Sequence, residues 1–73
     1  MRNTRFVICI DNSDYDATLE LRKIYELIKD LDAEREGYFR IVDESGEDYL
    51  YSSERFVKVS LPKNVKAAVI RAA

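Results

Sequence analysis

The sequence predicts a small domain built mainly from β-strands. Three runs rich in β-branched and aromatic residues support this prediction: 5–10, 38–42 and 48–51. The last two runs flank a polar turn that contains Gly46, and a glycine supplies the positive φ that a tight hairpin turn requires. Because the chain has only 73 residues, we expect one domain with a single modest core.

The first strand is predicted over residues 5–10, and it ends in the polar turn 11–14. Side chains of Asn, Asp and Ser in such a turn hydrogen-bond to nearby backbone groups and favour a loop. The lone cysteine, Cys9, lies inside the strand, where we expect a buried and unreactive thiol. A single cysteine cannot close a disulfide within the chain.

Residues 17–36 fit two different structures. Residues 24–28 form an acceptable strand, with alternate side chains on opposite faces. Four apolar residues of the same segment share the spacing of one helical face, and Gly37 would end such a helix. They are Leu21, Ile24, Ile28 and Leu31. The pattern alone leaves both a strand and a central helix open.

A one-turn corner, a last strand and a C-terminal helix follow the predicted hairpin. Residues 52–55 fit a single helical turn, and residues 56–60 fit a short strand. Pro62 suits the first turn of a helix, where its missing N–H costs nothing. A helix of about ten residues is marginal alone, so we expect its apolar stripe to pack on the same domain. The stripe consists of Leu61, Val65, Val69 and Ala72.

The order of these segments resembles that of bacterial SH3-like small barrels. After an early strand at 6–10, the run LELRKIYEL at 19–27 resembles the L-x-x-G-K-x-Y-x-V strand of that family. The turn 43–48 matches the family's distal turn, and 51–56 matches its aromatic corner. The chain also resembles a group of short uncharacterised bacterial proteins that share a D-E-S-G-E-D-Y-L-Y run. The resemblance spans about residues 5–60.

The resemblance implies a mainly β fold. Residues 1–60 would form an SH3-like barrel of about five strands, and residues 61–73 would form a short C-terminal helix docked on the same domain. Residues 19–29 would be mostly strand, and residues 30–36 a loop or one helical turn. The alternative fold is an α+β domain with a central helix at about 18–34.

Two positions depart from the family's pattern. Arg22 stands where the pattern often has glycine, at the start of the second strand. Ser52 stands where the pattern often has proline, at the corner.

The composition gives little support for catalysis. The chain has no histidine, the commonest acid–base group near neutral pH. Gly37 and Gly46 are its only glycines, so no glycine-rich loop can cradle a phosphate. A calcium loop counted from Asn12 fails, because Ala17 and Lys23 occupy the positions that require glycine and glutamate. We expect no enzymatic activity, no cofactor and no metal.

The resemblance also implies a peptide-binding surface. SH3 domains hold proline-rich peptides against an aromatic groove between the first long loop and the corner. The matching candidates here are Tyr15 in the loop, with Tyr49 and Arg55 near the corner. Three other rings are expected in the core: Tyr25, Tyr51 and Phe56. The chain lacks the tryptophan and the corner proline of a standard groove, so we expect a non-catalytic interaction or regulatory module that binds a protein or peptide.

The charge distribution supports nucleic acid as the alternative partner. A formal net charge of -2 argues against strong, general affinity for nucleic acid. However, residues 41–54 contain five acids and no base, whereas residues 55–73 contain five bases and no acid. A nucleic-acid-binding barrel would use those five bases: Arg55, Lys58, Lys63, Lys66 and Arg71.

The start of the chain indicates the expected location. The apolar run that follows residues 1–5 is too short for a signal sequence or a membrane span. We expect a cytoplasmic protein, a monomer or a weak homodimer, with no membrane partner.

Overall fold

The computed structural model describes residues 5–72, with side chains for residues 5–68. Five strands, two α-helices and a 3-10 turn make up this part of the chain. In order they are β1 (Arg5–Cys9), β2 (Ile24–Ile28), α1 (Leu31–Arg35), β3 (Tyr38–Val42), β4 (Asp48–Ser52), η1 (Ser53–Arg55), β5 (Phe56–Val59) and α2 (Lys63–Ala72). The prediction of a single, mainly β domain is confirmed.

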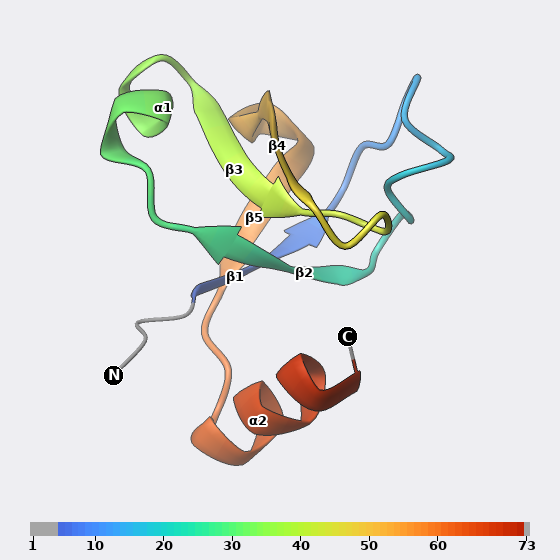
Figure 1. The fold of residues 1–73 in the computed structure, drawn as a ribbon, viewed down its shortest axis with the longest axis vertical. Helices are drawn as coiled ribbons and strands as arrows, with labels where there is room; N and C mark the ends of the chain where they lie inside the picture. The colour runs from blue at the N-terminus through green and yellow to red at the C-terminus, as the bar shows by residue number, and fades with distance from the viewer. Residues whose placement is uncertain (1–4, 73) are drawn as a thin grey trace.

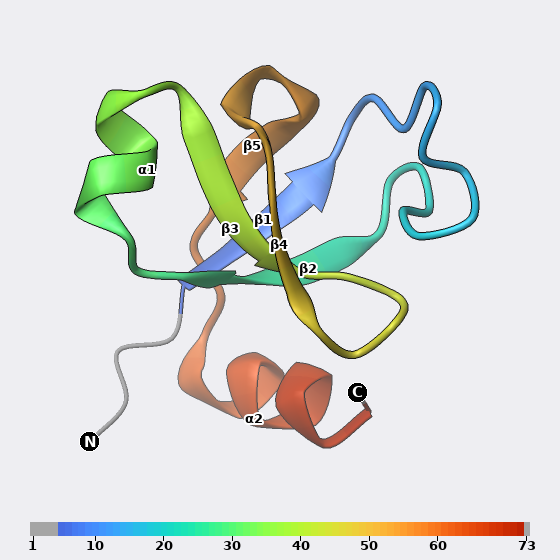
Figure 2. The same ribbon diagram turned by 45° about the horizontal axis from the view of Figure 1, so that its top comes forward.

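One antiparallel sheet contains all five strands, in the order β4-β3-β2-β1-β5. The sheet is strongly curved, so that the β3–β4 hairpin crosses over β1 and β5 in both views (Figure 1, Figure 2). The fold is therefore a small β-barrel with a short C-terminal helix, as the sequence predicts.

The central segment is a strand, and the alternative fold with a helix at 18–34 is wrong. β2 pairs with β1, where Tyr25 lies opposite Val7, and with β3, where Leu27 lies opposite Ile41. Tyr25 and Leu27 are buried, and the residues between and beside them are only partly buried. Burial thus alternates from one residue to the next, as it does in a strand packed between neighbours. The helical spacing of the apolar residues in the sequence does not reveal this alternation.

The segment before β2 is a turn rather than part of the strand, so the expected strand at 19–29 is too long at its start. Arg22 adopts a φ of 64°, in the left-handed region that glycine enters without strain. Its N–H donates to the carbonyl of Cys9 at 2.7 Å, and the N–H of Cys9 donates to the carbonyl of Lys23 at 2.9 Å. Arg22 therefore stands at a backbone position that favours glycine.

The segment after β2 forms the single helical turn that was expected at 30–36. Asp30 caps α1, because its carboxylate accepts a hydrogen bond from the N–H of Ala33 at 3.0 Å. Ala33 is the buried residue of this short helix. The helix ends at Arg35, and Gly37 follows it with a left-handed φ of 85°.

The predicted hairpin is confirmed. β3 and β4 pair with Phe39 opposite Tyr51, and the connecting turn closes with the N–H of Asp43 on the carbonyl of Glu47 at 3.1 Å. Gly46 has a φ of 84°, as the turn requires. This turn is called the distal turn below and comprises residues 43–47.

The core fills the inside of the barrel. The predicted core rings of Tyr25, Tyr51 and Phe56 are buried in it, and Phe39 packs against it. Cys9 is fully buried, and burial raises the pKa of its thiol, so the expectation of a buried thiol is confirmed. The remaining members of the cluster are Val7, Leu19, Leu27 and Ile41.

The C-terminal helix α2 lies outside the barrel, beneath β1 and β2 in both views (Figure 1, Figure 2). Phe6 is 2% exposed, although it faces the opposite side of β1 from the core residue Val7. Of the predicted apolar stripe, Leu61 is partly buried and Val65 is 37% exposed. The side chains of Val69 and Ala72 lie outside the described residues, and docking of the whole stripe stays a prediction.

Candidate functional site

The first loop, residues 10–23, forms one wall of the candidate site. Its backbone folds into a tight turn, because the N–H of Leu19 donates to the carbonyl of Tyr15 at 2.7 Å. The amide of Asn12 donates to the carbonyl of Leu19 at 3.1 Å, and the Leu19 side chain is buried in the core. The N–H of Ser13 donates to the Asp11 carboxylate at 2.9 Å, the side-chain bond expected of this polar turn. A long loop is thereby fixed to the barrel.

The ring of Tyr15 projects from this loop and is held from two sides. Its ring meets that of Tyr51 edge to face, with centroids 5.0 Å apart and an interplanar angle of 85°. The guanidinium of Arg55 lies 4.7 Å from the Tyr15 centroid, close enough for a cation–π interaction. Tyr15 nevertheless remains 43% exposed. It is a surface ring with a fixed orientation.

Arg55 ties the corner after β4 to the first loop. Its guanidinium donates to the carbonyl of Ser13 at 2.8 Å and lies 3.6 Å from the Asp11 carboxylate. Hydrogen bonds from Ser13, with a smaller contribution from Arg55, hold the pKa of Asp11 below its usual value. Only 19% of the Arg55 side chain is exposed, and its contacts join the corner to the loop that carries Tyr15.

Further rings continue inward from Tyr15. Tyr51 packs on Phe56 with centroids 6.0 Å apart, and Phe56 lies 6.5 Å from Phe39. The ammonium of Lys58 lies 5.4 Å from the Phe39 centroid at the far end of this series. Tyr51 and Phe56 are each 5% exposed, so Tyr15 supplies the accessible ring surface of the series.

A first set of buried and partly buried hydrogen bonds holds the distal turn against the first loop. The Tyr51 hydroxyl donates to the Asp43 carboxylate at 2.6 Å and lies 3.0 Å from the hydroxyl of Thr18. Asp43 also accepts from the N–H and the hydroxyl of Ser45 at 2.9 and 2.6 Å. Burial opposes ionisation of Asp43, but the bonds from Ser45 and Tyr51 outweigh it and lower the pKa of the carboxyl. Burial and the bond to Asp43 raise the pKa of Tyr51 to about 12.

A second set lies beside the first. The Glu44 carboxylate accepts from the Tyr25 hydroxyl at 2.6 Å and pairs with the Lys23 ammonium at 2.6 Å. Hydrogen bonds from Lys23 and Tyr25 hold the pKa of Glu44 below its ordinary value, while burial and the bond to Glu44 raise the pKa of Tyr25. The backbone N–H of Glu44 donates to the carbonyl of Thr18 at 3.0 Å.

These two sets of bonds are called the loop–turn clamp below. It consists of the side chains of Thr18, Lys23, Tyr25, Asp43, Glu44, Ser45 and Tyr51. Asp43 and Glu44, the two acids at the start of the distal turn, have a structural role, because donors already match each carboxylate. In the part of the chain that the structure describes, no group of three or more His, Cys, Asp or Glu side chains is placed to hold a metal ion.

The structure brings together two of the three predicted partner-binding residues, Tyr15 and Arg55. Tyr49 stands two residues before Tyr51 on β4 and therefore faces the same side of the strand. Tyr49 is 49% exposed, and its hydroxyl donates to Glu47 at 2.9 Å. Both predicted surface tyrosines are thus accessible, and both lie on the side of β4 that carries Tyr51.

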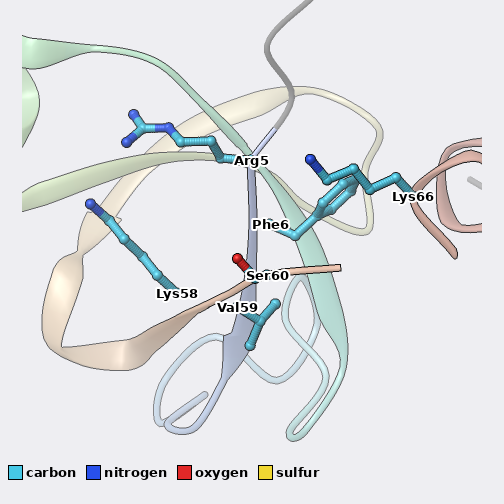
Figure 3. Close-up of a pocket in the computed structure, with 6 residues that line it drawn as sticks. All are labelled: Arg5, Phe6, Lys58, Val59, Ser60 and Lys66. Carbon is cyan, nitrogen blue, oxygen red and sulfur yellow. The ribbon is translucent and has the colours of Figure 1, made fainter. Parts of the chain in front are cut away.

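The five predicted nucleic-acid-binding residues do not form one continuous stripe. Arg55 is engaged with the first loop, and Lys58 lies 3.6 Å from the Glu34 carboxylate. Lys63 is exposed on α2, while Lys66 lines a surface hollow between α2 and the barrel (Figure 3). The Arg71 side chain lies outside the described residues.

Two features escaped the sequence analysis: the loop–turn clamp and the hollow beside Lys66. The first had a local signal, because an Asp two residues before a Ser in a turn commonly accepts from that residue's N–H. The hollow had none, because Arg5 and Lys66 are far apart in the chain.

Comparison of the chain with protein-family models, with curated proteins and with solved structures gave no match in any of the three. Among the residues described, no helix has the length and apolar character needed to cross a membrane.

Proposed function

We propose that this protein is a non-catalytic, SH3-like small barrel that binds a protein or peptide partner through the exposed rings of Tyr15 and Tyr49. Arg55 acts in this site by fixing the orientation of Tyr15. The SH3-like assignment is supported by the order of the elements: a long first loop, a hairpin with a glycine turn, and a one-turn helix leading into the last strand. The expectation of a cytoplasmic monomer or weak homodimer stays a prediction.

The observation that carries the proposal is the fixed orientation of the exposed Tyr15 ring. An aromatic side chain offers a large apolar surface with a hydroxyl at its edge, which suits recognition of a partner. A ring already held by Arg55 and Tyr51 loses little conformational entropy on binding. The loop–turn clamp also holds the first loop, which carries Tyr15, in place. The surface is therefore prepared for contact before a partner arrives.

The test is an affinity capture with matched tyrosine variants. Tyr15→Ala and Tyr49→Ala remove the proposed contact rings. Tyr38→Ala is the control, because Tyr38 is 45% exposed on β3 but alternates with Phe39 and faces away from the core. A partner retained by the wild type and by Tyr38→Ala should be lost or weakened at least about tenfold by Tyr15→Ala, as for a central interface aromatic. If all three variants retain it equally, the aromatic surface is not the binding site.

Nucleic acid remains the alternative partner, supported by the five bases that follow residue 54. Phosphate contacts weaken steeply as salt rises, whereas an aromatic contact changes little. Changing Lys63, Lys66 and Arg71 together to Ala separates the two functions. If this triple variant loses a partner that Tyr15→Ala and Tyr49→Ala retain, the nucleic-acid hypothesis replaces the aromatic one.

A further inference from the structure

The sheet has two free edges, because β4 and β5 each pair with a neighbour on one side only. On β4, the hydrogen bond from the N–H of Ser53 to the carbonyl of Gly37 fixes which residues join the ladder to β3. By the alternation of an antiparallel pair, Leu50 directs both its N–H and its carbonyl away from β3. Within residues 5–68, no hydrogen bond joins either of these two groups to the protein.

The edge of β4 is open over its first three residues. Asp48, Tyr49 and Leu50 are all exposed, although their side chains alternate between the two faces of the sheet. Figure 2 shows β4, in gold, in front of β1 and β2. The Arg40 guanidinium lies 3.0 Å from the Asp48 carboxylate and pairs with the one charged side chain of the strand. The edge therefore has an aliphatic residue at its centre and no unpaired charge, which makes it a template for another strand.

The edge of β5 is less available. The N–H of Phe56 already donates to the carbonyl of Ser53 within the corner. Lys58 lies in the middle of β5, and lysine on an edge strand is a residue with which natural sheets prevent pairing with another strand. Of the two free edges, the edge of β4 is thus the one suited to strand addition.

The face of β4 that points into the barrel indicates what kind of strand fits. Tyr49 is exposed on this face, and Tyr51 is covered by the exposed ring of Tyr15. Glu47, one residue before β4, continues the alternation, and its exposed carboxylate accepts from the Tyr49 hydroxyl at 2.9 Å. A strand beside β4 places three alternate side chains next to Tyr15, Tyr49 and Glu47 in turn. The two rings match apolar side chains, and the carboxylate matches a lysine or an arginine.

We propose that the free edge of β4 binds an extended segment of a partner protein, which adds to the sheet as a further strand. The backbone of this segment pairs with the N–H and the carbonyl of Leu50. Two alternate apolar side chains contact the rings of Tyr15 and Tyr49, and the next alternate side chain is a lysine or an arginine beside Glu47. The inference rests on the proposed partner function of the two tyrosines and specifies the partner's conformation. Proline is excluded where the segment donates to Leu50, because proline has no N–H.

The first experiment selects peptides from a random-sequence library on the full-length protein. The selected peptides should carry the alternating pattern, and their binding should slow hydrogen exchange at the Leu50 amide by at least about tenfold. Methylating the peptide nitrogen that pairs with the Leu50 carbonyl should weaken binding by at least about tenfold, whereas methylating the next nitrogen, which faces solvent, should change little. A selection that yields no binding peptide, or equal effects of the two methylations, would overturn the proposal.

A matched pair of proline variants tests the edge from the protein's side. Leu50→Pro removes the N–H at the edge of β4, and Lys58→Pro removes the corresponding N–H at the edge of β5. Neither N–H joins the ladder to the neighbouring strand, so both prolines stand where an edge strand tolerates them. Peptide binding should weaken by at least about tenfold in Leu50→Pro and stay unchanged in Lys58→Pro. Equal loss in the two variants contradicts the assignment to β4.

The tyrosine variants separate this inference from the function on which it rests. If the peptides lose binding to Tyr15→Ala and Tyr49→Ala but leave exchange at the Leu50 amide unchanged, the aromatic site stands and strand addition is wrong. If the peptides slow exchange at Leu50 and bind both variants as tightly as the wild type, strand addition stands and the aromatic contact is wrong.

Discussion

Where the first loop meets the distal turn, the carboxylates of Asp43 and Glu44 are matched by hydroxyl, amide and ammonium donors. Where β5 leads into α2, residues 58–66 carry three cations and no acid. At the first end Asp43 is 5% exposed and accepts from Ser45 and Tyr51. At the second end Lys66 has no ion pair within residues 5–68. Because a buried polar group without a partner is costly, satisfied groups stabilise the fold. Exposed charge without a close partner contributes little to stability. The difference therefore assigns a structural role to the acids of the loop–turn clamp, whereas the lysines near α2 are not needed to hold the fold together.

The largest expected effect breaks the loop–turn clamp. Asp43→Ala leaves the Tyr51 hydroxyl and the Ser45 groups without their buried acceptor, and should lower the free energy of unfolding by about 3 kcal/mol. Glu47→Ala is the control, because this acid lies in the same turn but is exposed, and its effect should stay within about 0.5 kcal/mol. Urea unfolding at neutral pH measures both. Similar losses in the two variants would mean that the clamp has no special part in stability.

The next prediction concerns the opposite end. Deleting residues 64–73 removes most of α2 from the side of the sheet on which Phe6 is buried. If α2 docks there, exposure of this ring should cost about 2 kcal/mol of unfolding free energy by area bookkeeping, and the melting temperature should fall at every protein concentration. A fall seen only at low concentration would instead indicate that the helix docks on a second copy. A truncated chain that melts like the full one would show that α2 is a free tail.

The clamp also predicts how stability depends on pH. The folded-state pKa values of Asp43 and Glu44 lie below their ordinary values, which are near 4 in an unfolded chain. A carboxyl with a lowered pKa contributes stability that is present above the unfolded pKa and is lost as the pH falls through the folded one. The urea midpoint should therefore be constant from about pH 7 to 5 and fall below about pH 4.5. Asp43→Ala should show a shallower fall, and an unchanged acid profile in this variant would exclude Asp43 as a source of the effect.

Sequence reasoning succeeded where the signal was local. The hairpin was predictable because its alternating strands and Gly46 lie within fifteen residues, and turn chemistry fixes its position. The strand β2 was ambiguous, since only its pairing with β1 and β3 distinguishes it from a helix. The clamp depends on contacts such as that of Tyr25 with Glu44, and the hollow beside Lys66 is lined by residues as distant as Arg5 and Lys66. Those contacts follow from strand register and helix placement, which spacing along the chain does not encode.

A smaller effect is expected from the turn that connects the first loop to β2. Arg22 has a left-handed φ of 64°, which costs a side-chain-bearing residue about 1 kcal/mol relative to glycine. Arg22→Gly should therefore stabilise the protein by up to about 1 kcal/mol, even though glycine raises the entropy of the unfolded chain. Arg35→Gly removes the same side chain from the end of helix α1 and should destabilise by a comparable amount, about 0.5–1 kcal/mol. Thermal melting of the two variants should shift in opposite directions. Equal shifts would mean that backbone conformation at Arg22 is not strained.

The smallest expected effect concerns the corner after β4, where proline is introduced at Ser52 and, separately, at Ser53. Ser52 has a φ of -56°, which proline adopts without strain, and the preceding Tyr51 is in a strand, as the residue before proline prefers. The N–H of Ser53 donates to the carbonyl of Gly37 at 2.9 Å, so the alternation of an antiparallel ladder turns the N–H of Ser52 away from β3. Ser52→Pro therefore loses no ladder bond and should stabilise the protein by about 0.5 kcal/mol, because it restricts the unfolded chain.

The matched variant is Ser53→Pro, one residue further along. It removes the donor to Gly37 and should destabilise the protein by at least about 1 kcal/mol. Two prolines at adjacent positions should thus shift the urea midpoint in opposite directions. If Ser52→Pro also destabilises the protein, the N–H or the side chain of Ser52 takes part in the hydrogen bonding of this corner.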